Sequence, residues 1–201
     1  MRYPKDHKDA SRQRLLAHSG SHAKQHGFEG SGMAALAASA GVTTGALYKH
    51  FDGKADLLKA LVATELERTA QMLAAIDAAD SAGAASVLAG YLSLQHVRRP
   101  GQGCPLPSLA PEIARAGEPV RAAYQAGLLD IHAQLARLTA SADDAWTLLA
   151  QHVGAVMLAR ALPDERLQLE LLAALRRAGE GLLNNPSPVA CACGSSTADP
   201  C

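Results

Sequence analysis

One short stretch near the N-terminus, Met33 to Phe51, constrains the fold more than any other part of the chain. Leu36, Ala37 and Ala40 fall on one face of a helix, and the two alanines are small enough to let a second helix cross closely. Gly41 supplies the backbone freedom that is needed directly after a helix C-terminus. The first half of the stretch therefore predicts a helix that ends in a tight turn.

The second half of the stretch predicts another short helix. Thr43 is a good N-cap residue, and Leu47 and Phe51, four residues apart, face inward together. The outer face then carries hydroxyls, a cation and a bare glycine, which suit contact with a duplex: Thr44, Gly45, Tyr48 and Lys49. The pattern is that of a helix-turn-helix and indicates DNA binding. A helical hairpin in the core of an ordinary all-helical protein is the alternative.

A longer run, Gly27 to Leu58, reads G-F-E-G-S-G-M-A-A-L-A-A-S-A-G-V-T-T-G-A-L-Y-K-H-F-D-G-K-A-D-L-L. It resembles the N-terminal domain of the TetR family of bacterial transcriptional regulators, most specifically in G-A-L-Y-K-H-F-x-x-K. The stretch from Tyr91 to Leu138 is similar to the C-terminal domain of one TetR subgroup. The resemblance implies that the following residues face the duplex: Thr43, Thr44, Gly45, Tyr48, Lys49 and Lys54.

Two residues near the end of the motif, His50 and Lys54, each have two interpretations. Lys54 opens the next helix, where free backbone N–H groups also favour a phosphate; a solvated lysine at a helix start is the alternative. His50 either adds a phosphate contact or is partly buried beside Phe51.

The composition favours helices over strands. Hydrophobic residues make up 48% of the 201 residues, and only 3% are aromatic while Ala and Leu dominate. Apolar periodicity adds helices to the two of the helix-turn-helix, at about residues 10–26, 54–76, 84–97, 109–116, 119–138, 142–162 and 163–183. We therefore expect an all-α fold of about nine helices.

Together with the resemblance, this pattern divides the chain into three parts. We expect a helix-turn-helix DNA-binding domain at residues 1–53, a helical effector-binding and dimerisation domain at residues 54–183, and a disordered tail at residues 184–201. The first ten residues are typical of a flexible arm, which is either frayed or touches DNA.

The first helix departs from the family pattern. Gly20, His22 and Ala23 stand in the part of this helix where family members usually place a large apolar side chain. Losing large core side chains is destabilising when nothing refills the space. We therefore expect that this helix either packs loosely or is compensated by a neighbouring segment.

Charge is unevenly divided along the chain. Residues 1–60 hold nine Lys and Arg against five Asp and Glu, while the remainder holds ten against fourteen. A basic N-terminal part beside an acidic remainder fits a DNA-facing module attached to one that avoids DNA. No apolar run approaches the roughly 20 residues that span a bilayer, and the N-terminus is too polar for a signal peptide. We expect a cytoplasmic protein with no membrane partner.

The resemblance also implies a small-molecule effector inside the C-terminal helices. Because such pockets are mostly apolar with few polar anchors, the candidates are the polar and aromatic residues there: Tyr91, Tyr124, His132, Trp146 and His152. Cys104 is a further candidate, since it lies in a Pro- and Gly-rich loop near Arg98 and Arg99, and a thiol near positive charge can have a lowered pKa. Either Cys104 reacts with electrophiles or oxidants, or it is a small buried residue lining the pocket.

A palindromic operator demands a symmetric protein, so we expect a homodimer. The last two predicted helices carry long apolar faces, and the candidates for a two-fold helix pair are Val153, Gly154, Met157, Leu171 and Leu175. The alternative is that these side chains fill their own core.

Other chemistry has little support in the sequence. Cys191, Cys193 and Cys201 lack the paired C-x2-C spacing of structural zinc, and no catalytic or phosphate-binding motif is present. We expect no enzyme, no cofactor and no metal. The predicted function is a repressor that binds a double-stranded DNA operator as a homodimer and is released by a small molecule. The alternatives are a thiol-based sensor acting through Cys104, a metal-responsive regulator, and an all-helical enzyme.

Overall fold

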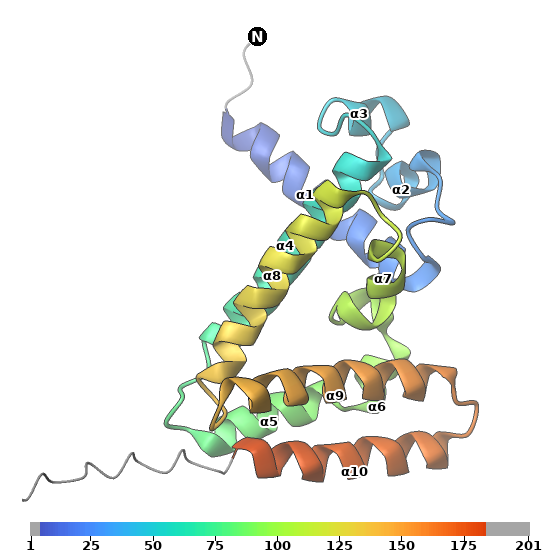
Figure 1. The fold of residues 1–201 in the computed structure, drawn as a ribbon. Helices are drawn as coiled ribbons and strands as arrows, with labels where there is room; N and C mark the ends of the chain where they lie inside the picture. The colour runs from blue at the N-terminus through green and yellow to red at the C-terminus, as the bar shows by residue number, and fades with distance from the viewer. Residues whose placement is uncertain (1–4, 184–201) are drawn as a thin grey trace, which may run out of the picture.

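The computed structural model describes residues 5–183, and every regular element within that range is a helix (Figure 1). The prediction of an all-α fold is confirmed. In chain order the elements are α1 (Lys5–His26), α2 (Met33–Ser39), α3 (Thr44–Tyr48), α4 (Lys54–Ala74), α5 (Ser81–Tyr91), α6 (Leu94–Arg98), the 3-10 helix η1 (Pro100–Gln102), α7 (Leu106–Ile113), α8 (Glu118–Ala136), α9 (Ala142–Ala161) and α10 (Glu165–Leu183). The predicted tail and the first residues of the predicted arm lie outside the described range.

Several predicted helix boundaries need correction. The helix expected at residues 84–97 is two helices, α5 and α6, because Ser93 adopts an extended backbone and its hydroxyl accepts the His96 N–H at 3.2 Å as the N-cap of α6. Helix α1 begins at Lys5, before the predicted residue 10, and α7 begins at Leu106 rather than near Leu109.

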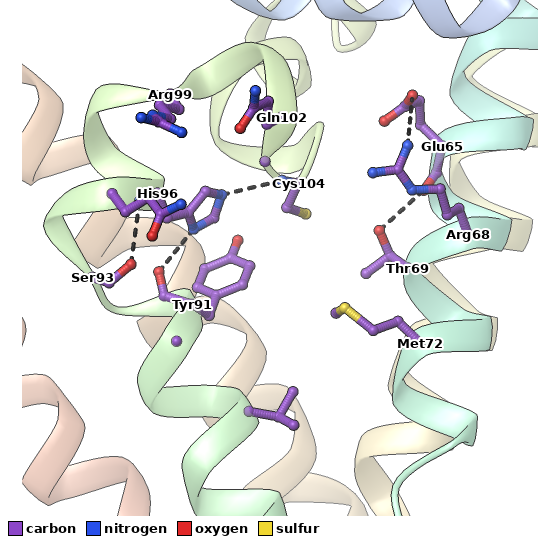
Figure 2. Close-up of a pocket in the computed structure, with 14 residues that line it drawn as sticks. Glu65, Arg68, Thr69, Met72, Tyr91, Ser93, His96, Arg99, Gln102 and Cys104 are labelled. Atoms are coloured by element: carbon purple, nitrogen blue, oxygen red, sulfur yellow. Dashed lines mark hydrogen bonds and ion pairs between the residues drawn. The ribbon is translucent and has the colours of Figure 1, made fainter.

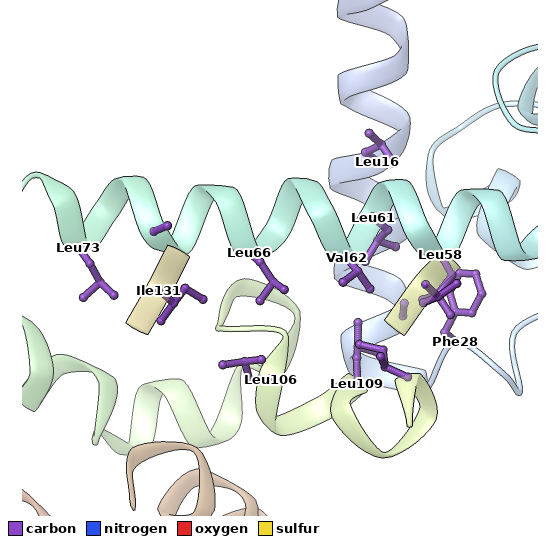
Figure 3. Close-up of a cluster of buried hydrophobic side chains, with 14 of the residues drawn as sticks. Leu16, Phe28, Leu58, Leu61, Val62, Leu66, Leu73, Leu106, Leu109 and Ile131 are labelled. Carbon is purple, nitrogen blue, oxygen red and sulfur yellow. The ribbon is translucent and has the colours of Figure 1, made fainter. Parts of the chain in front are cut away.

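Helix α4 is the long diagonal of the molecule (Figure 1) and carries a row of apolar side chains (Figure 3), and α8 packs along it more extensively than any other element does. Its predicted apolar stripe is buried at Leu57, Leu61 and Leu66, among others. The approach of α8 is close, because a Cβ added at Gly127 would lie 2.6 Å from the Cβ of Leu66. Met72 departs from the stripe, since it is 52% exposed.

The small residues of α1 are compensated by neighbours, which is the second of the two expected alternatives. Ser19 and Ala23 are fully buried, and a Cβ added at Gly20 would lie 3.2 Å from a carboxylate oxygen of Glu65 on α4. Helix η1 also packs against α1, where a Cβ added at Gly101 would meet α1 side chains. The missing volume in α1 is therefore filled by other elements that approach its backbone directly.

Helices α9 and α10 lie side by side at the opposite end of the molecule from α3 (Figure 1). Together with the α5–α6 segment they bury a second apolar cluster: Leu92, Val97, Ala155, Val156, Ala159 and Leu172. Large apolar side chains remain exposed on both α9 and α10. Within residues 5–183, no helix has the length and hydropathy required to cross a membrane.

Candidate DNA interface and internal cavity

The turn between α2 and α3 is built by local signals that the sequence predicts. Gly41 adopts a φ of +68°, and its N–H donates to the Ala38 carbonyl at 3.0 Å. The Thr43 hydroxyl accepts the Ala46 N–H at 3.3 Å and so caps α3. Leu47 is buried against the core, as is Phe51 just beyond the helix. The inward face of α3 is thereby fixed, and its other face is free for contact outside the molecule.

The predicted DNA-facing residues lie together on α3 and at its two ends. Thr43, Gly45 and Lys49 are exposed, and Tyr48 is 54% exposed although it is aromatic. The remaining three are half-buried: Thr44, His50 and Lys54. No DNA is present, so their contact with a duplex stays a prediction.

The ammonium of Lys54 is held at the start of α4. It donates to the Glu29 carbonyl at 2.7 Å and lies 5.4 Å from the ring centroid of Phe28. An ammonium has three donors, so this bond leaves two for another acceptor. Gly53 is the N-cap of α4, and the Asp52 N–H donates to the Asp56 carboxylate at 3.2 Å.

A cavity of about 450 Å³ lies between α4 on one side and the segment from α5 to Cys104 on the other (Figure 2). Its wall contains the following polar side chains: Glu65, Arg68, Thr69, Tyr91, Ser93, Gln95, His96, Arg99, Gln102 and Cys104. A second, apolar pocket shares Thr69, Met72, Val87, Tyr91 and Cys104 with it. Its other walls are Leu73, Leu88, Leu106, Ile131, Leu135, Leu148, Leu149 and His152. Because they share these five residues, the two pockets form one lining that is polar at one end and apolar at the other.

Three of the six predicted pocket residues line this space: Tyr91, Cys104 and His152. Tyr124 packs against the main core and lines a separate depression between α7 and α8. The prediction is wrong for His132 and Trp146, which stack on each other with ring centroids 4.1 Å apart and line neither pocket. The His132 ring bonds to the Ala142 carbonyl at 2.9 Å, which fixes the pair at the α8–α9 connection.

His96 fastens the loop that closes the polar end of the cavity. Its Nδ1 lies 2.8 Å from the Tyr91 carbonyl, and its Nε2 accepts the Cys104 N–H at 3.1 Å. Because Nδ1 must donate and Nε2 must accept, the ring is the neutral Nδ1–H tautomer. Burial lowers the pKa of His96 and favours the same neutral form. The ring lies so close to Gly103 that an added Cβ would come within 2.2 Å of it.

The structure favours the second interpretation of Cys104, that of a residue lining the pocket. Burial raises the pKa of the Cys104 thiol, and the nearby Glu65 carboxylate raises it further, while hydrogen bonds with the Leu106 backbone and the Tyr91 hydroxyl, together with the charge of Lys24, only partly offset this. The arginines expected to lower the pKa are engaged elsewhere or lie at the rim, since Arg98 pairs with Glu165 and Arg99 is exposed. Cys104 is therefore a protonated thiol that lines the pocket at neutral pH, which was the alternative interpretation.

The most unusual group near the cavity is the buried ammonium of Lys24 on α1, which no pattern in the sequence indicates. It donates to the Glu65 carboxylate at 2.6 Å and to the Gly103 carbonyl at 2.9 Å, and its side chain is 1% exposed. Both partners line the cavity. We call these three residues the Lys24 clamp.

A second attachment joins α7 to the end of α1. The Glu112 carboxylate accepts the Phe28 N–H at 2.9 Å and the Glu29 N–H at 2.8 Å. Helix α1 and the residues that follow it are thus fixed to the cavity wall by one buried cation and to α7 by one carboxylate.

The fold and the helix-turn-helix define the class of protein, that of all-helical transcriptional regulators with an N-terminal recognition helix. Residues 22–61 match the model of a family described as bacterial regulatory proteins, tetR family. This match supports the resemblance to TetR-family regulators that the sequence predicted.

Solved structures show the same fold over most of the chain. The reduced form of NemR from Escherichia coli is 24% identical with a TM-score of 0.70, and the alignment covers 88% of this chain and 100% of that one. A transcriptional regulator from Rhodococcus sp. Rha1 is 22% identical with a TM-score of 0.68, covering 86% and 95% of the two chains. A TetR-family regulator from Agrobacterium tumefaciens is 18% identical with a TM-score of 0.68, covering 85% and 97%. A search of curated sequences finds no match.

The burial of His152, at the apolar end of the cavity, predicts how the free energy of unfolding changes with pH. Burial lowers its pKa from 6.5 to about 4, while its Nδ1 bonds to the Leu148 carbonyl at 2.9 Å. The unfolded chain therefore binds more protons than the folded chain between these two values, so stability is retained above pH 6.5 and falls as the pH drops toward 4. Linkage sets the loss at roughly 3 kcal/mol at most.

The measurement is urea unfolding between pH 4 and 7, with His152→Asn as the matched variant because its amide can still donate to Leu148. We expect the variant to lose less stability than the wild type on acidification. Equal losses in the two proteins would contradict a neutral, buried His152.

Proposed function

We propose that the protein is a transcriptional repressor that binds a palindromic operator as a homodimer and is released when a small molecule occupies the cavity. In this proposal residues 1–53 form the DNA-binding domain and residues 54–183 form the effector-binding and dimerisation domain. The observation that carries the proposal is the Lys24 clamp, because it connects helix α1, which packs against α2, directly to two residues of the cavity wall.

The exposed face of α3 is the proposed DNA contact. Thr43, Tyr48 and Lys49 offer hydroxyls and a cation on one side of a short helix whose other side is anchored by Leu47. Such a helix fits the major groove, with hydroxyls and cations on phosphates and base edges. The ammonium of Lys54 and the N-terminus of α4 supply an additional phosphate contact beside it.

The proposed dimer surface is the outer side of α9 and α10. Met157 and Leu158 on α9, and Leu167 and Leu169 on α10, are large apolar side chains that are exposed in the single chain. Nothing lies within 4 Å of a Cβ added at Gly154, so a helix of a second copy has room to approach there. Of the predicted interface residues, Leu171 and Leu175 also pack against the second core cluster, and Val153 packs against the main one.

Release follows from the position of the clamp. A ligand that displaces the 100–104 loop or Glu65 removes an acceptor from the buried Lys24 ammonium, so α1 must shift to find another partner. The ligand and the operator then favour different arrangements of the same helices, and each weakens the binding of the other by the same factor.

The DNA contact is tested by gel shift on duplexes from the DNA flanking the protein's own gene. Tyr48→Ala and Lys49→Ala are expected to weaken operator binding at least about tenfold without lowering the melting temperature, because both side chains are exposed. Lys49→Ala should also reduce the slope of log K against log salt by about one.

Arg166→Ala on α10 is the matched control, since it removes one exposed cation far from α3. Removing one half of the palindrome should abolish tight binding if the protein binds as a dimer. Unchanged binding by both α3 variants would contradict the proposed DNA face.

Covalent sensing at Cys104 is the second candidate function. One observation favours it: the thiol lines the cavity, so a reagent that enters there would reach it. One of the similar structures is described as the reduced form of Escherichia coli NemR. The raised pKa of the thiol opposes it, because little thiolate is present at neutral pH.

This candidate is tested in a Cys191→Ser, Cys193→Ser, Cys201→Ser background that leaves Cys104 as the single thiol. We expect alkylation by iodoacetamide to be slow at pH 7 and to accelerate only above the pKa of an ordinary cysteine, about 8.5. Fast alkylation at pH 7 that also releases operator DNA would instead establish Cys104 as a sensor. Cys104→Ser in the same background controls for other sites.

A further inference from the structure

We infer that the cavity binds a small amphipathic organic anion, with a carboxylate at the polar end and an apolar body at the other. This inference rests on the proposed function, since it names the chemical class of the effector. It is carried by three features of the lining: its charge, a buried hydroxyl whose partner is only a thiol, and its continuous apolar end.

The charge of the polar end is positive. Arg68 and Arg99 line it with guanidinium groups, and Glu65 is the carboxylate of that wall. Glu65 already pairs with Lys24 at 2.6 Å and lies 4.0 Å from Arg68. Arg99 makes no ion pair within the described part of the chain. Counting Lys24 with the wall, three cations face one anion, so an anionic ligand is favoured and a cationic one is repelled.

Tyr91 supplies a directional donor. Its hydroxyl is buried with no nitrogen or oxygen atom as a partner, and it bonds to the Cys104 thiol, toward which Figure 2 shows it pointing at the edge of the cavity. Burial raises the pKa of this hydroxyl, so it remains a donor. Sulfur is a weak acceptor, so an oxygen acceptor on a ligand is a better partner for this donor. A carboxylate has two oxygens, one for this hydroxyl and one for a guanidinium.

The other end of the lining excludes a ligand that is polar throughout. Leu88, Leu106, Ile131, Leu135, Leu148 and Leu149 surround the apolar extension, and His152 beside them is kept neutral by burial. Thr69, Met72 and Val87 border both ends, so one molecule can span them. A cavity of about 450 Å³ is within the range of small-molecule sites. The apolar extension itself holds only about 40 Å³, so it suits the end of an alkyl chain, while the rest of an apolar body lies along Thr69, Met72 and Val87.

The experiment is calorimetric titration of the full chain with sodium octanoate, sodium decanoate and sodium 4-phenylbutyrate. Each has a matched neutral amide: octanamide, decanamide and 4-phenylbutanamide. We expect at least one carboxylate to bind about tenfold or more tightly than its amide, because only the carboxylate gains the guanidinium contacts. Three variants separate the contacts: Arg68→Gln/Arg99→Gln, Tyr91→Phe and, as a distant control, Arg166→Gln.

The double arginine variant is expected to weaken carboxylate binding about tenfold and to leave amide binding unchanged. Tyr91→Phe should weaken both, because the amide carbonyl also accepts from the hydroxyl. Arg166→Gln should change neither. Equal affinity of carboxylates and amides, or no binding of any carboxylate at millimolar concentration, would overturn the inference.

A gel shift without ligand on the same preparations distinguishes a failure of this inference from a failure of the proposed function. If the operator is bound and no carboxylate binds, the ligand class is wrong and the regulator stands. If a carboxylate binds as predicted and no operator DNA is bound, the ligand class is supported and the proposed function fails.

Discussion

The buried ammonium of Lys24 is the interaction on which the rest of the arrangement depends. A charge removed from water must be paired and hydrogen-bonded, and removing one partner of such a pair typically costs about 3–5 kcal/mol. Lys24 meets this demand with one carboxylate on α4 and one carbonyl in the loop before α7. The position of α1 and the shape of the cavity are therefore not independent, because the same cation requires both acceptors.

The small residues around this cation have a common purpose. Ser19, Gly20 and Ala23 let α4 and η1 approach the backbone of α1 closely enough for Lys24 to reach across. On the far side of the loop, the neutral His96 ring packs on Gly103 and holds the Cys104 amide. Bulkier side chains at these positions would separate α1 from the loop. The small residues that suggest a weak core in the sequence are the ones that allow α1 to contact α4 and the loop before α7.

Local signals were enough to predict the helix-turn-helix and most helix positions. Gly41, Thr43 and Leu47 act through their own turn of the chain, so their roles can be read without knowing what packs against them. The break at Ser93 was missed because the apolar spacing continues through it, while the hydroxyl that caps α6 acts only once the helix has ended.

The cavity was predicted less well, because its walls come from segments far apart in sequence. His132 and Trp146 are as suited to a pocket as Tyr91 is, yet they stack on each other at the α8–α9 connection. Nothing in the composition of α1 tells a buried lysine from a solvated one, so Lys24 was not found. Two interpretations of Cys104 remained open because sequence proximity to arginines does not show burial, which is the largest influence on its pKa.

The most direct test of the account is hydrogen exchange at the amides of residues 99–104, measured with and without operator DNA. If Lys24 couples the recognition helices to the cavity, operator binding should change the protection of this loop in the wild type. The change should disappear in Lys24→Met/Glu65→Met, which removes both charges and leaves neither buried alone. Loop exchange that is insensitive to operator in the wild type, or a response that survives in the double variant, would contradict the coupling.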